Sequence, residues 1–224
     1  MSRNALDDFD EHPNANSRND EDNENADQKH FCLIPESRFI PVMITVADLT
    51  NGLAAGMSIR YFPIFFLDNL LLSPRLVQAL FLSSTLAMAV FGQIAQKLSE
   101  KFGILPVTII ARWIGMSLMI AMVATYQLNA PVWVVSMVWA LRTAIMNSTG
   151  ALTRSILMDN VPTQERAKWS ALESVNFAGW SGSAAFGGFL VDWAGIEINF
   201  YVTAGISFLA TIPLLRLLGK VGKG

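Results

Sequence analysis

The sequence predicts an all-α membrane protein with six transmembrane helices, and two observations carry this prediction. The 224 residues are 52% hydrophobic and only 15% charged, which is too apolar for an ordinary soluble domain. From Ile40 onward, six apolar stretches reach the length of about 20 residues that a helix needs to cross roughly 30 Å of hydrocarbon. So many stretches leave too little polar surface to coat a soluble fold of buried helices.

The six expected helices are separated by short connections that contain proline, asparagine or charged residues. Two of these connections are Lys97–Gly103 and Asp192–Glu197. The expected helices are Ile40–Phe66, Leu76–Gln96, Leu105–Thr125, Pro131–Thr153, Ser170–Val191 and Ile198–Leu218.

The first 37 residues differ in composition from the rest of the chain. Met1 to His30 contains nine acidic and three basic residues and almost no large apolar side chains. Such a segment cannot bury enough apolar surface to offset the entropy of ordering, so we expect a disordered acidic tail at residues 1–37. The transmembrane domain then covers residues 38–219, and residues 220–224 form a second, short tail.

Basic residues divide unequally between the two sides of the expected bundle. Ten fall on the side that carries both chain ends, whereas the opposite side has Arg75 alone. Because Lys and Arg collect on the cytoplasmic side, we expect both termini to be cytoplasmic, which agrees with an even number of crossings. The ten are Lys29, Arg38, Lys97, Lys101, Arg154, Arg166, Lys168, Arg216, Lys220 and Lys223.

The residues needed for common catalytic and metal sites are missing from the expected helices. The two histidines, His12 and His30, lie in the tail, so no helix offers a histidine-based zinc site or a Ser-His pair. There is no phosphate-binding Gly-Lys-Ser/Thr loop, and the single Cys32 excludes an internal disulfide. We therefore expect no enzyme activity, no metal, no cofactor and no nucleic-acid partner. The lipid bilayer is the expected surrounding.

A small set of polar and ionisable side chains interrupts the apolar helices. Each charge near the bilayer centre costs about 2.5–3.5 kcal/mol, so several charges together need a wet cavity or partners. They recur at helical spacing, which places them on one stripe of each helix, facing protein or water. The candidate cavity residues are Asp48, Asn51, Arg112, Arg142, Asn147, Glu173, Asn176 and Trp180.

Several roles remain open for these residues. Arg142 is the best candidate for a central polar contact, although it could instead form an interhelical ion pair with Asp48 or Glu173. Either acid could carry a coupled proton if burial raises its pKa. Arg112 could lie near a helix end and extend to the interface, and Trp180 could be a packing aromatic.

Small residues predict where helices approach closely. Gly52 and Gly56 are four residues apart in the first expected helix, and Gly179, Ser183 and Gly187 repeat this spacing in the fifth. Such faces allow helix backbones to come together in membranes.

The connection after the second expected helix carries a recognisable motif. Leu98, Ser99, Glu100, Lys101 and Gly103 resemble the signature of the major facilitator superfamily, Gly-x-Leu-Ala/Ser-Asp-Arg/Lys-x-Gly-Arg/Lys-Arg/Lys. The chain departs from it at Gln96, in place of the first glycine, and at the two trailing positions. The resemblance implies that Leu98, Glu100, Lys101 and Gly103 form a cytoplasmic gate, with Arg154 as a partner.

A second copy of this pattern follows the fifth expected helix. Leu190, Asp192 and Gly195 repeat the order of leucine, acid and glycine seen at Leu98, Glu100 and Gly103. Two copies, between helices 2 and 3 and between helices 5 and 6, predict a three-plus-three inverted repeat. Asp192 and Gly195 thus join the gate candidates.

The resemblance covers residues 38–219 and implies the C-terminal six-helix half of a major facilitator fold. It implies a secondary transporter that moves a small solute by alternating access, with proton coupling as an option, and a tail that links two halves. Three interpretations follow: part of a longer protein, which we favour, a six-helix protein that dimerises, or a remnant without transport. The alternative from another class is a membrane scaffold whose polar stripes only hold helices together.

Overall fold

A computed structural model describes residues 39–159 and 166–218 of the chain. The chain divides into two compact units, residues 1–39 and residues 40–224, and the description below concerns the second. The predicted tails at residues 1–37 and 220–224 lie outside the described residues, as does the segment 160–165.

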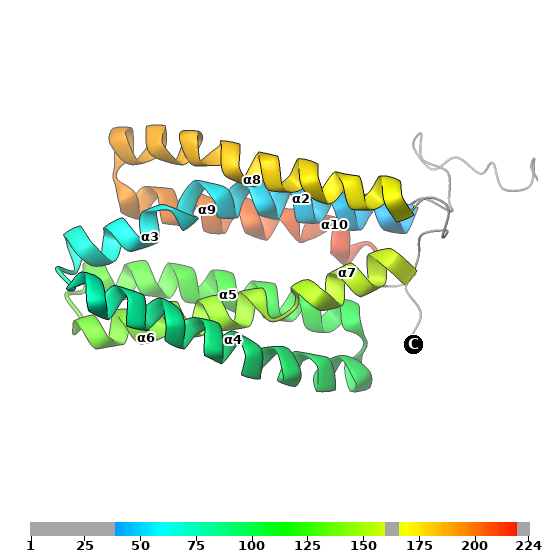
Figure 1. Cartoon of the computed structure of the whole chain (residues 1–224), viewed down its shortest axis with the longest axis horizontal. Helices are drawn as coiled ribbons and strands as arrows, with labels where there is room; N and C mark the ends of the chain where they lie inside the picture. The colour runs from blue at the N-terminus through cyan, green and yellow to red at the C-terminus, as the bar shows by residue number, and fades with distance from the viewer. Residues whose placement is uncertain (1–38, 160–165, 219–224) are drawn as a thin grey trace, which may run out of the picture. The chain divides into compact units, whose positions relative to one another are not determined.

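Every described element is a helix (Figure 1). They are α2 (Phe39–Ile59), α3 (Tyr61–Ile64), the π-helix η2 (Phe65–Asn69), α4 (Pro74–Phe102), α5 (Ile104–Gln127), α6 (Val132–Asn147), α7 (Gly150–Asp159), α8 (Arg166–Ala194), α9 (Ile196–Ala210) and α10 (Ile212–Leu215). Helical segments therefore lie at all six predicted positions.

Four stretches of the described chain are long and apolar enough to cross a bilayer. They are Ile40–Asn69, Pro74–Phe102, Ile104–Gln127 and Ile196–Leu215. Residues 39–159 and 166–218 thus form the helical part of a membrane protein, while the crossings predicted at α6–α7 and at α8 stay predictions.

The first and last predicted helices are not continuous, because each contains a proline. Helix α2 ends at Ile59 and α9 ends at Ala210, and a short helix follows each break. The rings of Pro63 and Pro213 clash with the carbonyl four residues earlier, at Ile59 and Leu209, and proline has no N–H to donate. Both predicted spans are nonetheless present, since Ile40–Asn69 and Ile196–Leu215 are each long and apolar enough to cross a bilayer.

The fourth predicted helix is also broken, between α6 and α7, at the sequence Asn147-Ser-Thr-Gly150. The Asn147 side-chain amide donates a hydrogen bond to the Thr143 carbonyl at 2.9 Å, and the Ser148 hydroxyl donates to the Ile145 carbonyl at 2.7 Å. Side chains that bond to nearby carbonyls compete with the helical pattern, and glycine is a weak helix former. The prediction of one helix over Pro131–Thr153 was therefore wrong.

The two charged connections predicted at Lys97–Gly103 and Asp192–Glu197 are mostly helical. Helix α4 continues to Phe102 and α8 continues to Ala194, so one residue, Gly103 or Gly195, separates each from the next helix. Lys, Glu and Leu are good helix formers, and nothing before either glycine breaks the helix.

Helix α5 is the most enclosed of the long helices. It packs against α4, α6 and α9, and its buried face includes Met119, Met122 and Val123. These residues join an aromatic core made with Phe65, Phe200 and their neighbours, in which the Phe65 and Phe200 ring centroids lie 5.5 Å apart. Within this unit, the start of α2, the α4–α5 turn and the ends of α7 and α10 lie at one end (Figure 1).

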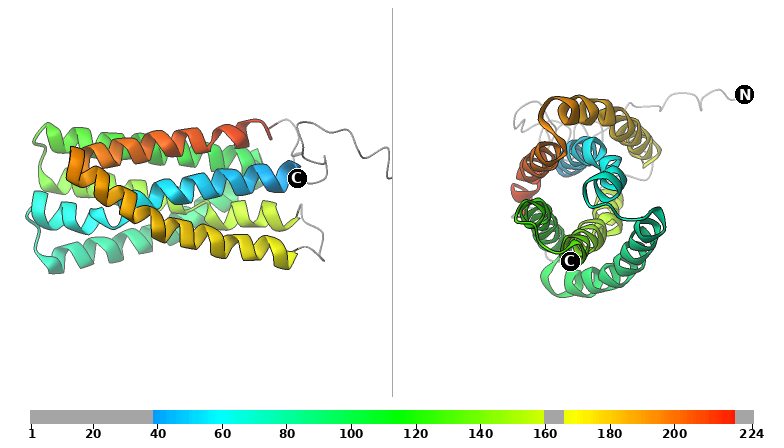
Figure 2. Two further views of the ribbon diagram at one scale, coloured as in Figure 1. Left: turned by 90° about the horizontal axis from the view of Figure 1, so that it is seen from above. Right: turned by 90° about the vertical axis from the view of Figure 1, so that its left-hand side faces the viewer.

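Helices α2 and α8 approach closely at glycines, and Figure 2 shows α8 crossing α2. A Cβ atom at Gly56 would overlap the Trp180 carbonyl, and one at Gly187 would overlap the Met57 carbonyl. The close face predicted from Gly52, Gly56, Gly179, Ser183 and Gly187 is therefore present between these two helices.

We expect Gly187→Ala to destabilise the protein by about 1–3 kcal/mol, because the new methyl group must push α8 away from the α2 backbone. The matched control is Gly182→Ala in the same helix, where nothing lies within 4 Å of the added Cβ. That control should be neutral or slightly stabilising, since alanine is the better helix former. Thermal unfolding of the detergent-solubilised chain measures both, and equal effects would contradict the close packing.

Candidate functional site

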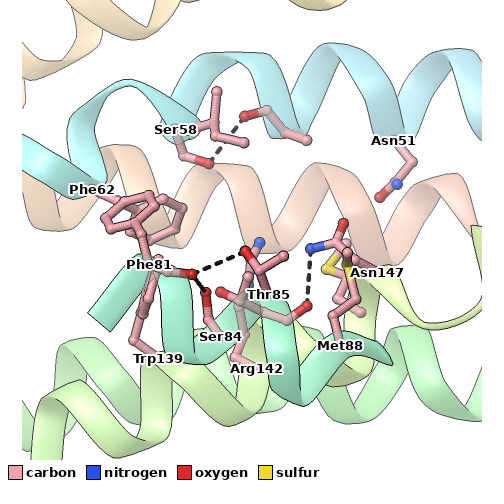
Figure 3. Close-up of a pocket in the computed structure, with 14 residues that line it drawn as sticks. Asn51, Ser58, Phe62, Phe81, Ser84, Thr85, Met88, Trp139, Arg142 and Asn147 are labelled. Atoms are coloured by element: carbon pink, nitrogen blue, oxygen red, sulfur yellow. Dashed lines mark hydrogen bonds between the residues drawn. The ribbon is translucent and has the colours of Figure 1, made fainter. Parts of the chain in front are cut away.

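A cavity of about 250 Å³ lies between α2, α4 and α6 (Figure 3). Its lining comes from the polar stripe of α2, from the middle of α4 and from one face of α6, with Phe62 of α3 at one end. The polar lining residues are Asn51, Ser58, Ser84, Thr85, Arg142, Thr143 and Asn147. Of the eight cavity candidates chosen from the sequence, the structure places Asn51, Arg142 and Asn147 here.

The hydroxyl groups on the α2 and α4 walls of the cavity already donate hydrogen bonds to their own helices. The Ser84 and Thr85 hydroxyls donate to the Phe81 carbonyl at 2.8 and 3.0 Å, and Ser58 donates to the Ala55 carbonyl at 3.3 Å. These bonds are common for Ser and Thr within helices and satisfy their protons locally. The donors without a partner therefore lie elsewhere in the cavity, on α6.

The Arg142 side chain is buried and has only neutral partners in the described part of the chain. It is 7% exposed, its Nη2 donates a weak hydrogen bond to Met119 Sδ at 3.5 Å, and its guanidinium lies 5.3 Å from the Phe62 ring centroid. Its Nε has no hydrogen-bond partner. A buried cation with soft, neutral partners is only partly stabilised.

The second buried arginine, Arg112, is neutralised by an acid. Its Nη2 lies 2.5 Å from Asp48 Oδ1, and the two side chains are 7% and 31% exposed. This ion pair joins α5 to α2. The sequence had offered two other interpretations, an Asp48–Arg142 pair and an Arg112 side chain at the membrane interface, and both were wrong. The spacing of residues within one helix does not tell which other helix lies beside it, because that depends on the packing of the bundle.

Asn176 and Trp180 lie between α8 and α2, away from the cavity lining. Asn176 Oδ1 faces Gly52 and has no hydrogen-bond partner, whereas the Trp180 backbone lies against Gly56. The Trp180 ring stacks on Phe177 with centroids 5.4 Å apart, which fits the packing role considered for it. The side chain of Glu173 lies outside the described part of the chain.

The gate candidates lie near the C-terminal ends of α4 and α8, at the glycines that follow these two helices and, for Arg154, in the middle of α7. Leu98, Glu100, Lys101, Arg154 and Asp192 are exposed.

Gly103 and Gly195 occupy matching turns after α4 and α8. Their φ, ψ angles are +86°, +151° and +92°, +165°, and each N–H donates to the carbonyl four residues earlier at 2.9 Å. Residues other than glycine rarely adopt this conformation, so both turns depend on glycine.

Sequence reasoning missed the aromatic end of the cavity and the whole α4 wall. Phe62, Phe81 and Trp139 gather at one end, with the Phe81 and Trp139 ring centroids 4.7 Å apart (Figure 3). Nothing in their local sequence separates them from ordinary packing aromatics. The run Ser83-Ser84-Thr85 in an otherwise apolar helix was a usable signal for the α4 wall.

Long apolar helices around a polar cavity define an integral membrane protein with an internal site. A family model of the Major Facilitator Superfamily matches residues 44–223, and the chain belongs to this family of secondary transporters. No curated protein and no solved structure matches the chain. Members of this family are generally not enzymes, and they contact lipid and carry small solutes across membranes.

We expect Asp48→Asn and Arg112→Gln each to lower the free energy of unfolding by about 1–3 kcal/mol, because each leaves its partner charge inside the bundle without an opposite charge. The double variant should lose less than the sum of the two, and the difference measures the pair. The control is Arg60→Gln at an exposed position. Denaturant unfolding of the chain in micelles gives the four values, and strict additivity would show that the pair contributes nothing.

Proposed function

We propose that this chain moves a small solute across a membrane by alternating access, and that the solute binds at Arg142. The observation that carries this proposal is a buried guanidinium with an unpartnered Nε on the wall of a cavity between helices, in a member of a transporter family. An arginine kept inside the bundle without a described acidic partner is expensive, and a polar or charged solute would stabilise it.

We propose further that the six helical segments cross the bilayer as two inverted repeats of three. The matching glycine turns support this: Gly103 joins the second segment to the third, and Gly195 joins the fifth to the sixth. The two turns lie at opposite ends of this unit, as two repeats of inverted topology require (Figure 1).

The residues at the first turn, Leu98, Glu100, Lys101 and Gly103, are proposed to close the cytoplasmic side together with Arg154. Asp192 and Gly195 are their counterparts in the second repeat. The close α2–α8 face supports movement of helices past one another, because small residues leave little side-chain interlocking to break.

We place both chain ends in the cytoplasm, on the side where the basic residues gather. A second six-helix unit, either another part of a longer protein or a second copy of this chain, is proposed to complete the cavity. Native mass spectrometry of the purified 24.6 kDa chain tests the second copy, which a monomer alone would exclude.

Asp48 is the described acid that we propose for proton coupling, with Glu173 as the other candidate. Protonation of Asp48 would neutralise the partner of Arg112 and so weaken the contact between α2 and α5. A proton could in this way change how the helix that carries Asn51 packs.

Cysteine labelling tests whether water reaches the cavity, as transport of a solute through it requires. In a chain lacking Cys32, Asn51→Cys and Thr85→Cys should react with a water-soluble thiol reagent, because both positions line the cavity. Val123→Cys is the matched control, since Val123 is fully buried in the core and should stay unreactive. If the cavity positions stay unreactive in every condition, the scaffold alternative, which family membership does not favour, would stand.

The same reaction tests the finer claims. If Asp48 carries a proton, the pH dependence of the Asn51→Cys labelling rate should differ between the chain with Asp48 and the chain with Asp48→Asn, because the pH dependence of the thiol itself is common to both. Native Cys32 should be protected from an impermeant reagent outside intact cells and react after permeabilisation. Reaction from outside would overturn the proposed orientation.

A further inference from the structure

We infer that the solute bound at Arg142 is a small organic anion with an apolar or aromatic body. This inference rests on the proposed function and names the chemical class of its solute. It follows from the charge, the unpartnered polar atoms and the shape of the cavity.

The charge of the cavity is the first step. Among the described residues that line it, Arg142 is the one charged side chain, and no acid is present. Arg112, which lies on α5 and not in the lining, has its charge matched by Asp48. The protein therefore neutralises one buried arginine internally and leaves the other facing an open space. A guanidinium fork binds an anionic group such as a carboxylate through two parallel, charge-assisted hydrogen bonds.

The unpartnered polar atoms are the second step. Arg142 and Thr143 follow Trp139 by three and four residues on α6, and all three side chains line the cavity. The Trp139 Nε1, the Arg142 Nε and the Thr143 hydroxyl are all buried without a hydrogen-bond partner. Buried donors are rarely left unpaired, and three on one face of a cavity can surround one anionic group.

A single unpartnered acceptor lies across the cavity on α2. Asn51 Oδ1 is buried and receives no hydrogen bond. A solute that carries a hydroxyl or amine group besides its carboxylate could donate to it. The protein thus offers hydrogen-bond donors on α6 to the anionic group of the solute and one hydrogen-bond acceptor on α2, on the opposite wall.

The shape of the cavity is the third step. Phe62, Phe81 and Trp139 close one end, Asn51 and Asn147 lie toward the other, and Arg142 lies between them (Figure 3). The volume of about 250 Å³ corresponds to about eight water molecules at roughly 30 Å³ each. A compact aromatic or branched apolar body fits against the rings, with its carboxylate at Arg142.

The test compares three probes of one size and different charge: benzoate, benzamide and benzylamine. Each is titrated into the full chain in lipid nanodiscs, with empty nanodiscs as the blank, and binding is followed by calorimetry. We expect benzoate to bind at least about tenfold more tightly than either other probe, because charge-assisted hydrogen bonds to Arg142 form with the anion alone.

Two substitutions assign the preference to Arg142. Arg142→Gln should reduce benzoate binding by about tenfold or more and remove its advantage over benzamide. Arg142→Lys keeps the charge and should retain the anion preference at lower affinity, since lysine lacks the planar fork. Arg75→Gln removes the same charge from an exposed position and should change nothing.

The inference is overturned if benzamide or benzylamine binds as well as benzoate, if none of the three binds, or if Arg142→Gln keeps the preference while remaining folded by circular dichroism. These outcomes are separate from failure of the proposed function. If the cavity cysteines react with thiol reagents but the chain does not bind benzoate, the transport proposal stands and the inference of an anionic solute is rejected. If the chain binds benzoate but the cavity cysteines never react, the anion site stands and the proposed water-accessible transport path is rejected.

Discussion

The inability of hydrocarbon to form hydrogen bonds is the constraint on which the rest of this structure depends. Every described element is a helix because a helix satisfies its backbone internally, and the polar side chains of α2, α4 and α6 turn toward one another because lipid cannot partner them. The polar cavity forms because these side chains point toward one another. Where α2 and α8 meet at glycines, as at Gly56 and Gly187, the missing side chains let the two helices close to backbone contact.

The two buried arginines show how the same side chain takes different roles in one bundle. Arg112 reaches Asp48 across the α2–α5 contact, so its charge holds two helices together. Arg142 meets a thioether and an aromatic ring, which stabilise a guanidinium weakly and leave its Nε free. A paired charge stabilises a structure, whereas a partly satisfied one is available to a ligand, and this difference is the basis for placing the solute at Arg142.

Local sequence chemistry explains both the successes and the failures of the prediction. Long apolar runs located the helical segments to within a few residues, apart from the extensions at the C-terminal ends of α4, α7 and α8. The prediction of one helix failed at Asn147–Gly150, because a count of hydrophobic residues does not register helix breakers. The same count did not register the local breaks that Pro63 and Pro213 cause within spans that were predicted correctly. For the site, periodicity found Asn51, Arg142 and Asn147, since a polar residue in a lipid-crossing helix stands out. The aromatic end was not found, because Phe62, Phe81 and Trp139 look like any packing residues until their neighbours are known.

The sequence by itself determined that this is a helical membrane protein of the Major Facilitator Superfamily, with close glycine faces and a few inward polar side chains, because composition, helical period and motif are properties of a single segment. Only the tertiary structure decided that Arg112 pairs with Asp48 and that Arg142 is left with neutral partners. It also decided that Gly103 and Gly195, in two separate turns, adopt the same backbone conformation. Asp48 and Arg112 are 64 residues apart, and their meeting depends on which helices are neighbours and at what depth. Spacing along one helix carries no information about either.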